Sequence, residues 1–193
     1  MALRTLTLTT GTSMATLESA PVLLGLAASV AVVHTAIGVD HALPFVVLSR
    51  VQGWSFRRTL LVTGLCGLGH IASAVLIGLV AVGLGLAVEQ LVSIEELRGQ
   101  LGLSLLVAFG LVYAAIGAVS LLRRHPHAHP HERQRAVTAW TMFVILVFGP
   151  CEALVPLLLA PGVMQDYALL AGVIAVFGAL TVATMLVLVA AGV

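Results

Sequence analysis

Long apolar stretches separated by short polar ones run through the whole chain. A helix rises about 1.5 Å per residue, so about 20 apolar residues cross a hydrocarbon core roughly 30 Å thick. Sustained alternation of apolar and polar residues is absent, which argues against a β-barrel. The pattern predicts an all-α polytopic membrane protein with five transmembrane helices, at about 20–48, 59–88, 101–122, 137–160 and 167–193.

The composition narrows the class further. Hydrophobic residues make up 60% of the 193 positions and charged residues only 9%, whereas a soluble domain carries about 25% charged residues. A soluble nucleotide-binding enzyme, a nucleic-acid-binding domain and a disulfide scaffold are therefore excluded. We expect one transmembrane domain over 20–193, preceded by a short extracytoplasmic segment over 1–19.

The arginines predict the orientation in the membrane. Seven of the nine basic residues, all of them arginine, lie in the loops 49–58 and 123–135. Positive charge favours the cytoplasmic side, so both loops are predicted to be cytoplasmic and the N-terminus outside, in the cytoplasmic membrane. Five spans then leave the C-terminus inside while the sequence is still apolar. We therefore expect a sixth helix to be missing from this sequence or supplied by a partner subunit.

Spans one and four contain a short internal match. Residues 38–43, Gly-Val-Asp-His-Ala-Leu, align with residues 149–154, Gly-Pro-Cys-Glu-Ala-Leu, and prolines follow at Pro44 and Pro156. The two spans run in opposite directions, so the copies would form an inverted repeat with broken helices 1 and 4. Many transporters build a substrate site near the bilayer midplane from such a repeat.

The same two spans carry the acids that lie deepest in the apolar sequence. Asp40 and Glu152 occupy corresponding places in the repeat, and an acid inside a membrane helix is a functional candidate by default. His34 and His41 flank Asp40 in an H-x5-D-H pattern, and His70 lies in the second span. Imidazole and carboxylate together suit Ni, Co, Zn or Mn. The alternative is that these groups only make structural hydrogen bonds.

Two cysteines, Cys66 and Cys151, each lie in a predicted span, and there is no CxxC. Cys151 could bind a metal beside Glu152, or the two thiols could form a membrane-embedded redox pair. They could equally be two small buried apolar side chains.

The loop between spans three and four has histidines at alternate positions, separated by prolines. Such a biased, ligand-rich tract is typical of metal capture, although it could also be a solvated polar turn. The four candidate ligands for secondary capture are His125, His127, His129 and His131.

Three motifs together resemble a known group of transporters. They are H-x5-D-H over 34–41, Gly-Leu-Gly-His over 67–70 and Phe-Gly-Pro-Cys-Glu over 148–152, joined by the His-rich loop. The chain resembles the NicO-type nickel/cobalt transporters and the urease-accessory-type, sulfite-exporter-like membrane proteins. These are distantly related to the thiol-disulfide conduits of the DsbD and CcdA type.

The resemblance implies a three-plus-three inverted repeat and metal binding by six side chains: His34, Asp40, His41, His70, Cys151 and Glu152. Two features depart from the family pattern. The best-known nickel permeases have H-x4-D-H, with one residue fewer. The redox branch pairs two cysteines at helix breaks, whereas here Asp40 is the counterpart of Cys151.

The leading hypothesis is a transporter, and not an enzyme, that moves a divalent metal ion (Ni or Co, or Zn) as its substrate. No nucleotide-binding motif is present, so a gradient or a partner would drive transport. The alternatives are transmembrane thiol-disulfide transfer by Cys66 and Cys151, export of an anion of the sulfite type, and a catalytic metal site. Membrane lipid is an expected partner, and the many small residues in the spans would allow a homodimer.

Overall fold

All secondary structure that the computed structural model describes is α-helical. It describes residues 2–84, 88–122, 132–149, 151, 153–160 and 166–193. The prediction of an all-α protein is confirmed for this part of the chain. Its helices are α1 (Ala2–Ile37), α2 (Val39–Gln52), α3 (Phe56–Gly83), α4 (Val88–Leu122), α5 (Glu132–Phe148), α6 (Val155–Leu158) and α8 (Tyr167–Gly192).

Four of the described helices are long and apolar enough to cross a membrane, where the sequence pattern predicts five. The four candidate spans are Ala20–Ile37, Phe56–Val80, Glu89–Val119 and Tyr167–Gly192. The region 137–160 is not one continuous helix, because α5 ends at Phe148 and α6 begins only at Val155. Proline has no N–H to continue a helix, and Pro150 follows the end of α5 by two positions. The apolar part of α5, Thr138–Phe148, is therefore short.

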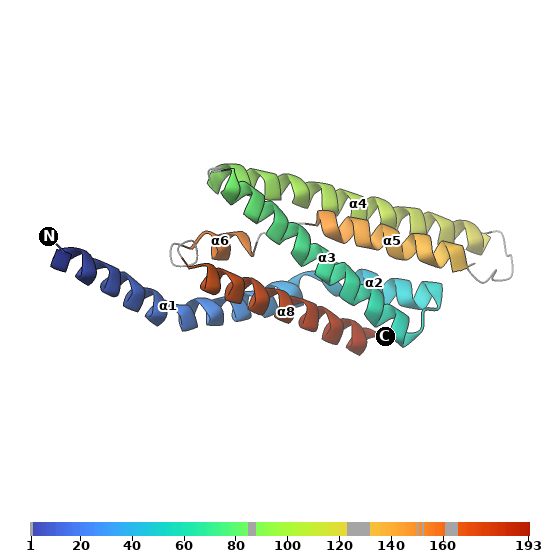
Figure 1. The fold of residues 1–193 in the computed structure, drawn as a ribbon. Coiled ribbons are helices and arrows are strands. Elements are labelled where there is room, and N and C mark those ends of the chain that lie inside the picture. Colours follow the sequence, from blue (N-terminus) through green and yellow to red (C-terminus); the bar gives the residue numbers. More distant parts are fainter. Residues whose placement is uncertain (1, 85–87, 123–131, 150, 152, 161–165) are drawn as a thin grey trace.

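The helices form two groups that α3 joins (Figure 1). On one side α4 packs along α5, and on the other α1 and α2 pack against α8. Because α3 contacts both α5 and α8, it ties the groups together. Helices α1 and α2 follow each other as two halves of one interrupted helix.

A single row of buried side chains explains the central place of α8. Every fourth residue of this helix is buried, which places the row on one face. The row consists of Leu169, Val173, Phe177, Thr181, Met185 and Val189. Asp166 caps the start of the helix, where its Oδ1 accepts hydrogen bonds from the backbone N–H groups of Ala168 and Leu169 at 2.8 and 3.1 Å.

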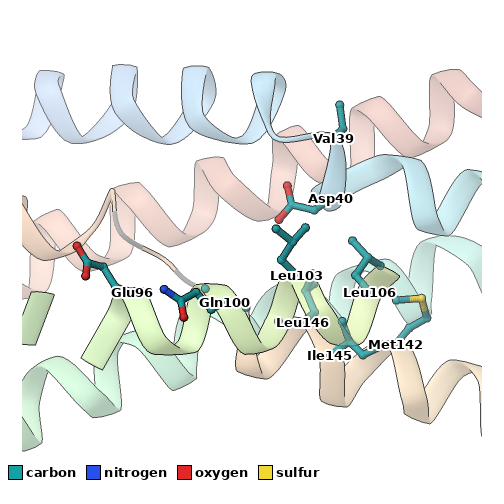
Figure 2. Close-up of a pocket in the computed structure, with 12 residues that line it drawn as sticks. Val39, Asp40, Glu96, Gln100, Leu103, Leu106, Met142, Ile145 and Leu146 are labelled. Atoms are coloured by element: carbon teal, nitrogen blue, oxygen red, sulfur yellow. The ribbon is translucent and has the colours of Figure 1, made fainter. Parts of the chain in front are cut away.

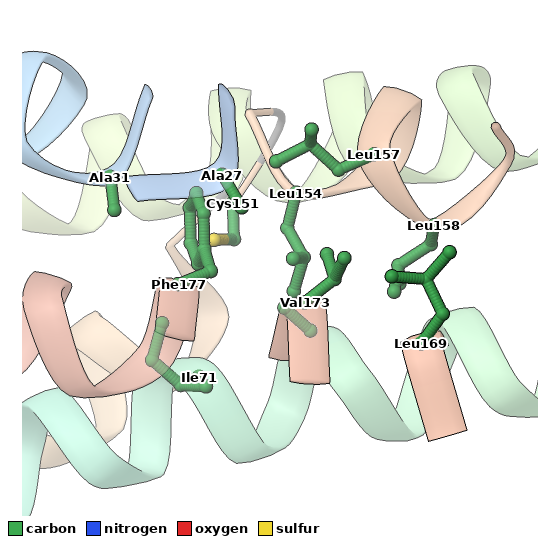
Figure 3. Close-up of a cluster of buried hydrophobic side chains, with 11 residues drawn as sticks. Ala27, Ala31, Ile71, Cys151, Leu154, Leu157, Leu158, Leu169, Val173 and Phe177 are labelled. Carbon is green, nitrogen blue, oxygen red and sulfur yellow. The ribbon is translucent and has the colours of Figure 1, made fainter. Parts of the chain in front are cut away.

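Small residues let α1 approach α8 closely. Ala27 and Ala31 are completely buried, and both belong to a cluster with Val173 and Phe177 (Figure 3). Because alanine is small, the backbones of the two helices can come close together and make more van der Waals contacts. Such contacts are a main source of helix association in lipid. Cys151 belongs to the same cluster.

Helix α4 begins earlier than the sequence pattern predicts. Its first residue is Val88, not a residue near 101. The predicted spans 59–88 and 101–122 leave Glu95 and Arg98 in the extracytoplasmic connection between them, but both residues are in this helix and only 3% and 7% exposed. That prediction took the charged stretch 89–100 for a connection. The two opposite charges pair with each other at i and i+3, which allows a helix to bury both.

The close packing of α1 leads to a first prediction. Replacing Ala31 by leucine would force a branched side chain against the buried cluster with Phe177. Overpacking costs about 1–3 kcal/mol, so we expect a lower midpoint for thermal unfolding of the detergent-purified protein. Val33→Leu is the control, because Val33 is 55% exposed. Equal midpoints for the two variants would contradict the close approach of α1 and α8.

Candidate functional site

The interruption between α1 and α2 places two of the predicted site residues. Helix α1 ends at Ile37, Gly38 has an extended backbone (φ −68°, ψ 99°), and α2 starts at Val39. Asp40 and His41 therefore lie in the first turn of a new helix. The last helical hydrogen bond of α1 reaches the break, because the Gly38 N–H donates to the carbonyl oxygen of His34 at 2.9 Å.

Three predicted site histidines form a row across α1, α2 and α3. The ring centroids of His34 and His41 are 5.0 Å apart, and those of His41 and His70 are 5.6 Å apart. Both pairs meet edge to face, at 77° and 84°. His41 and His70 are only 2% and 1% exposed. The structure thus brings together three residues that the sequence separates by up to 36 positions (70 minus 34).

Asp40 lies at the outer side of this row. Its Oδ1 is 3.1 Å from Nδ1 of His41, and its side chain is 43% exposed. Hence one side of the carboxylate contacts a buried imidazole, and the other side is accessible.

The protonation of His70 follows from its partner. Nδ1 of His70 lies 2.9 Å from the backbone carbonyl oxygen of Leu146 in α5. A carbonyl oxygen only accepts hydrogen bonds, so Nδ1 is the protonated nitrogen. A neutral His70 then has a free lone pair on Nε2.

Most ring nitrogens in the row have no hydrogen-bond partner within the described part of the chain. They are Nε2 of His34, His41 and His70, and also Nδ1 of His41, whose 3.1 Å contact with Oδ1 of Asp40 lacks the geometry of a hydrogen bond. A buried polar atom without a partner costs free energy and calls for an explanation. However, no three His, Cys, Asp or Glu side chains among the described residues are arranged to hold a metal ion.

A pocket of about 540 Å³ opens beside Asp40, between the start of α2, α4 and α5. Figure 2 shows Asp40 on the α2 side of this pocket, across from Leu103 and Leu106 of α4. Glu96 and Gln100 line it further along α4. The Asp40 carboxylate can be reached from this pocket, whereas His41 behind it is buried.

The Glu95–Arg98 pair is a buried polar feature that the sequence analysis missed. Nη1 of Arg98 pairs with Oε1 of Glu95. Nη2 of Arg98 also donates to the carbonyl oxygen of Val147 at 3.0 Å and to that of Gly149 at 3.2 Å. The two opposite charges at i and i+3 in an apolar helix were the available signal.

The structure does not bring the two cysteines together. Both are free and buried. Cys66 packs with Met142 and Met185, and Cys151 packs in the separate cluster around Phe177. The remaining predicted ligands lie outside the described residues: Glu152, His125, His127, His129 and His131.

Comparison with known proteins identifies no relative of this chain. No protein-family model, curated protein or solved structure matches the chain. Its function has to be inferred from its own residues.

Gly38 allows a specific test of this geometry. A Cβ at position 38 would lie 2.3 Å from Nδ1 of His41, so Gly38→Ala must displace the imidazole. We expect a loss of about 1–3 kcal/mol of unfolding free energy from overpacking, measured by thermal unfolding in detergent. The double variant Gly38→Ala/His41→Ala should recover most of this loss, because the clashing ring is gone.

Gly25→Ala is the matched control. This glycine lies inside α1 with no atom within 4 Å of the added methyl, and alanine stabilises a helix interior by about 0.5–1 kcal/mol relative to glycine. If Gly38→Ala behaves like Gly25→Ala, His41 does not rest against Gly38.

Proposed function

We propose that this protein is a membrane transporter of a divalent transition-metal ion, with Ni²⁺ or Co²⁺ as the preferred substrate. The ion would pass through the row of His34, His41 and His70, with Asp40 compensating its charge. Cys151 and Glu152 are proposed to contribute further ligands, and the histidines of the 123–135 loop to gather ions at the cytoplasmic face. A gradient or a partner protein would supply the energy.

The observation that carries this proposal is the hydrogen bond from His70 to Leu146. Histidines that bind metals almost always donate their other ring N–H to a carboxylate or a backbone carbonyl, which fixes the tautomer and the direction of the ring. His70 has this arrangement, and its Nε2 is buried without a partner near the His41 ring. A purely structural histidine would be expected to use both nitrogens.

The nature of the ligands favours a first-row divalent ion. Neutral imidazole and a carboxylate suit Ni, Co and Zn better than Mg or Ca, which prefer oxygen ligands alone. Because the rings meet edge to face, we propose that an arriving ion turns the nitrogens of His34 and His41 toward it. Such an adaptable site is suited to transport, since the ion must also leave.

The packing of the helices supports an inverted repeat. Both breaks start at a glycine that the short sequence match aligns, Gly38 after α1 and Gly149 after α5. In such a repeat, α1–α2 would correspond to α5–α6, and α3 would correspond to α8. The contact between α1 and α8 would then have its counterpart in the contact between α5 and α3. Both contacts occur. We therefore propose that the broken α5–α6 unit is the fifth span. This arrangement agrees with the resemblance to NicO-type transporters.

The proposed orientation places the N-terminus outside and the loops 49–58 and 123–135 in the cytoplasm. It rests on the seven arginines in these loops. Arg98 lies outside these two loops. It does not weaken the proposed orientation, because its side chain is paired with Glu95 inside the protein and is not a loop charge.

The decisive test is the metal content of the detergent-purified protein. To exclude binding by the loop, the four loop histidines are first replaced by asparagine. In this background we expect near-stoichiometric Ni or Co after loading. His70→Ala and His41→Ala should weaken binding by at least about 10–100-fold, the loss typical even for groups that only orient a ligand. Uptake of radioactive nickel into proteoliposomes should fall in parallel.

Thr63→Val is the matched control. Thr63 is completely buried on the same helix as His70. Its hydroxyl has no hydrogen-bond partner within the described part of the chain, so valine, which has a similar shape, removes no hydrogen bond. This variant should retain both metal and uptake. Metal content that is the same in His41→Ala, His70→Ala and Thr63→Val would overturn the proposal.

A further inference from the structure

Helix α4 carries a buried ion pair that the proposed ion path does not use. Glu95 and Arg98 are paired within one turn and almost fully buried. Burying two charges is expensive, and the attraction between them rarely repays it unless further hydrogen bonds satisfy both groups. The other contacts of the pair therefore indicate what it does.

These contacts lie at the end of α5 and within the break that follows it. Nη2 of Arg98 donates to the carbonyl oxygen of Val147, near the end of α5, and to that of Gly149, where the break starts. Oε2 of Glu95 accepts from the backbone N–H of Cys151, within the break, at 3.2 Å. One ion pair thus holds three backbone groups of the segment 147–151.

Helix α3 contributes to the same network. Nη2 of Arg98 also donates to Oγ of Ser73 at 3.0 Å, and this hydroxyl lies 2.8 Å from the carbonyl oxygen of Val147. Ser73 is one turn from His70 on α3. The end of α5 is therefore fixed against α3 at the level of His70.

The carbonyl that His70 uses, that of Leu146, comes directly before this fixed segment. In a continuous helix the oxygen of Leu146 would accept from the N–H of residue 150, but that residue is a proline and has none. Leu146 instead accepts from the N–H of Gly149 at 3.0 Å and from Nδ1 of His70 at 2.9 Å.

We propose that Glu95 and Arg98 are positioning residues for His70. By holding Val147, Gly149 and Cys151, the pair directs the Leu146 carbonyl at Nδ1 of His70 and thereby keeps the lone pair on Nε2. The effect on the tautomer follows from the hydrogen bonds alone. The effect on metal affinity rests on the proposed function.

Nitrogen NMR of ¹⁵N-histidine-labelled protein in detergent tests the tautomer directly, because protonated and unprotonated ring nitrogens have well-separated shifts. The His70 signals are assigned by their loss in His70→Gln. We expect a protonated Nδ1 and an unprotonated Nε2 in the native protein. Arg98→Met should convert His70 to a mixture of tautomers, and Arg98→Lys, which keeps the charge next to Glu95, should retain more of the native form.

Two controls match the charge changes. Glu89→Gln removes an exposed acid from the same helix, and Arg57→Met removes an exposed arginine from α3; both should leave the His70 signals unchanged. If Arg98→Met does not fold, the double variant Glu95→Gln/Arg98→Gln leaves no unpaired buried charge and is expected to fold. It should show the same mixture of tautomers.

Metal binding in the same variants separates the two proposals. We expect the dissociation constant for nickel to rise about 10–100-fold in the Arg98 variants, as for other residues that orient a metal ligand. An altered tautomer in a protein that binds no metal would support the positioning role and refute the transport site. Unchanged His70 signals and unchanged affinity in both Arg98→Met and the double variant would overturn the positioning role alone.

Discussion

The backbone groups at the end of α5 need hydrogen-bond partners inside an apolar protein, and the rest of the candidate site depends on how they find them. Leu146 and Gly149 are buried, and a buried backbone polar group without a hydrogen-bond partner costs free energy. His70, Ser73 and Arg98 supply donors to the carbonyls of this segment. Since these donors come from α3 and α4, pairing the broken end also fixes where α5 lies against both helices.

The two helix breaks are stabilised in different ways. At the α1–α2 break, Gly38 has no side chain, and the vacant space is filled by the His41 ring. At the α5 break, an ion pair and a hydroxyl replace the missing helical hydrogen bonds. An inverted repeat would make the two breaks equivalent in position, yet their chemistry differs. The first break carries Asp40 and His41, and the end of α5 before the second break carries the Leu146 carbonyl that accepts from His70 on α3.

The sequence was informative where the chemistry is local. Apolar stretches predicted the described spans to within a few residues for α3 and α8, and the glycine before Asp40 and His41 predicted the broken first helix. It failed for α4, because the charged residues of the stretch 89–100 look like a solvated connection until the pairing of Glu95 with Arg98 is recognised. The tautomer of His70 was out of reach for another reason. Its partner, Leu146, is 76 positions away, and any residue type could offer the same carbonyl.

The division of labour between charged groups follows from their exposure. Asp40 lies beside His41, but it is half exposed at the edge of a pocket, so its carboxylate remains accessible to a cation. Glu95 is buried and bonded to Arg98 and to the N–H of Cys151, so it has no free oxygen to offer an ion. Asp40 and Glu95 are both carboxylates, but of the two only Asp40 can be reached from the pocket. In the proposed ion path, a metal that enters from the pocket would meet Asp40 first and then Nε2 of His41 and of His70, while the Glu95–Arg98 pair is proposed to position His70.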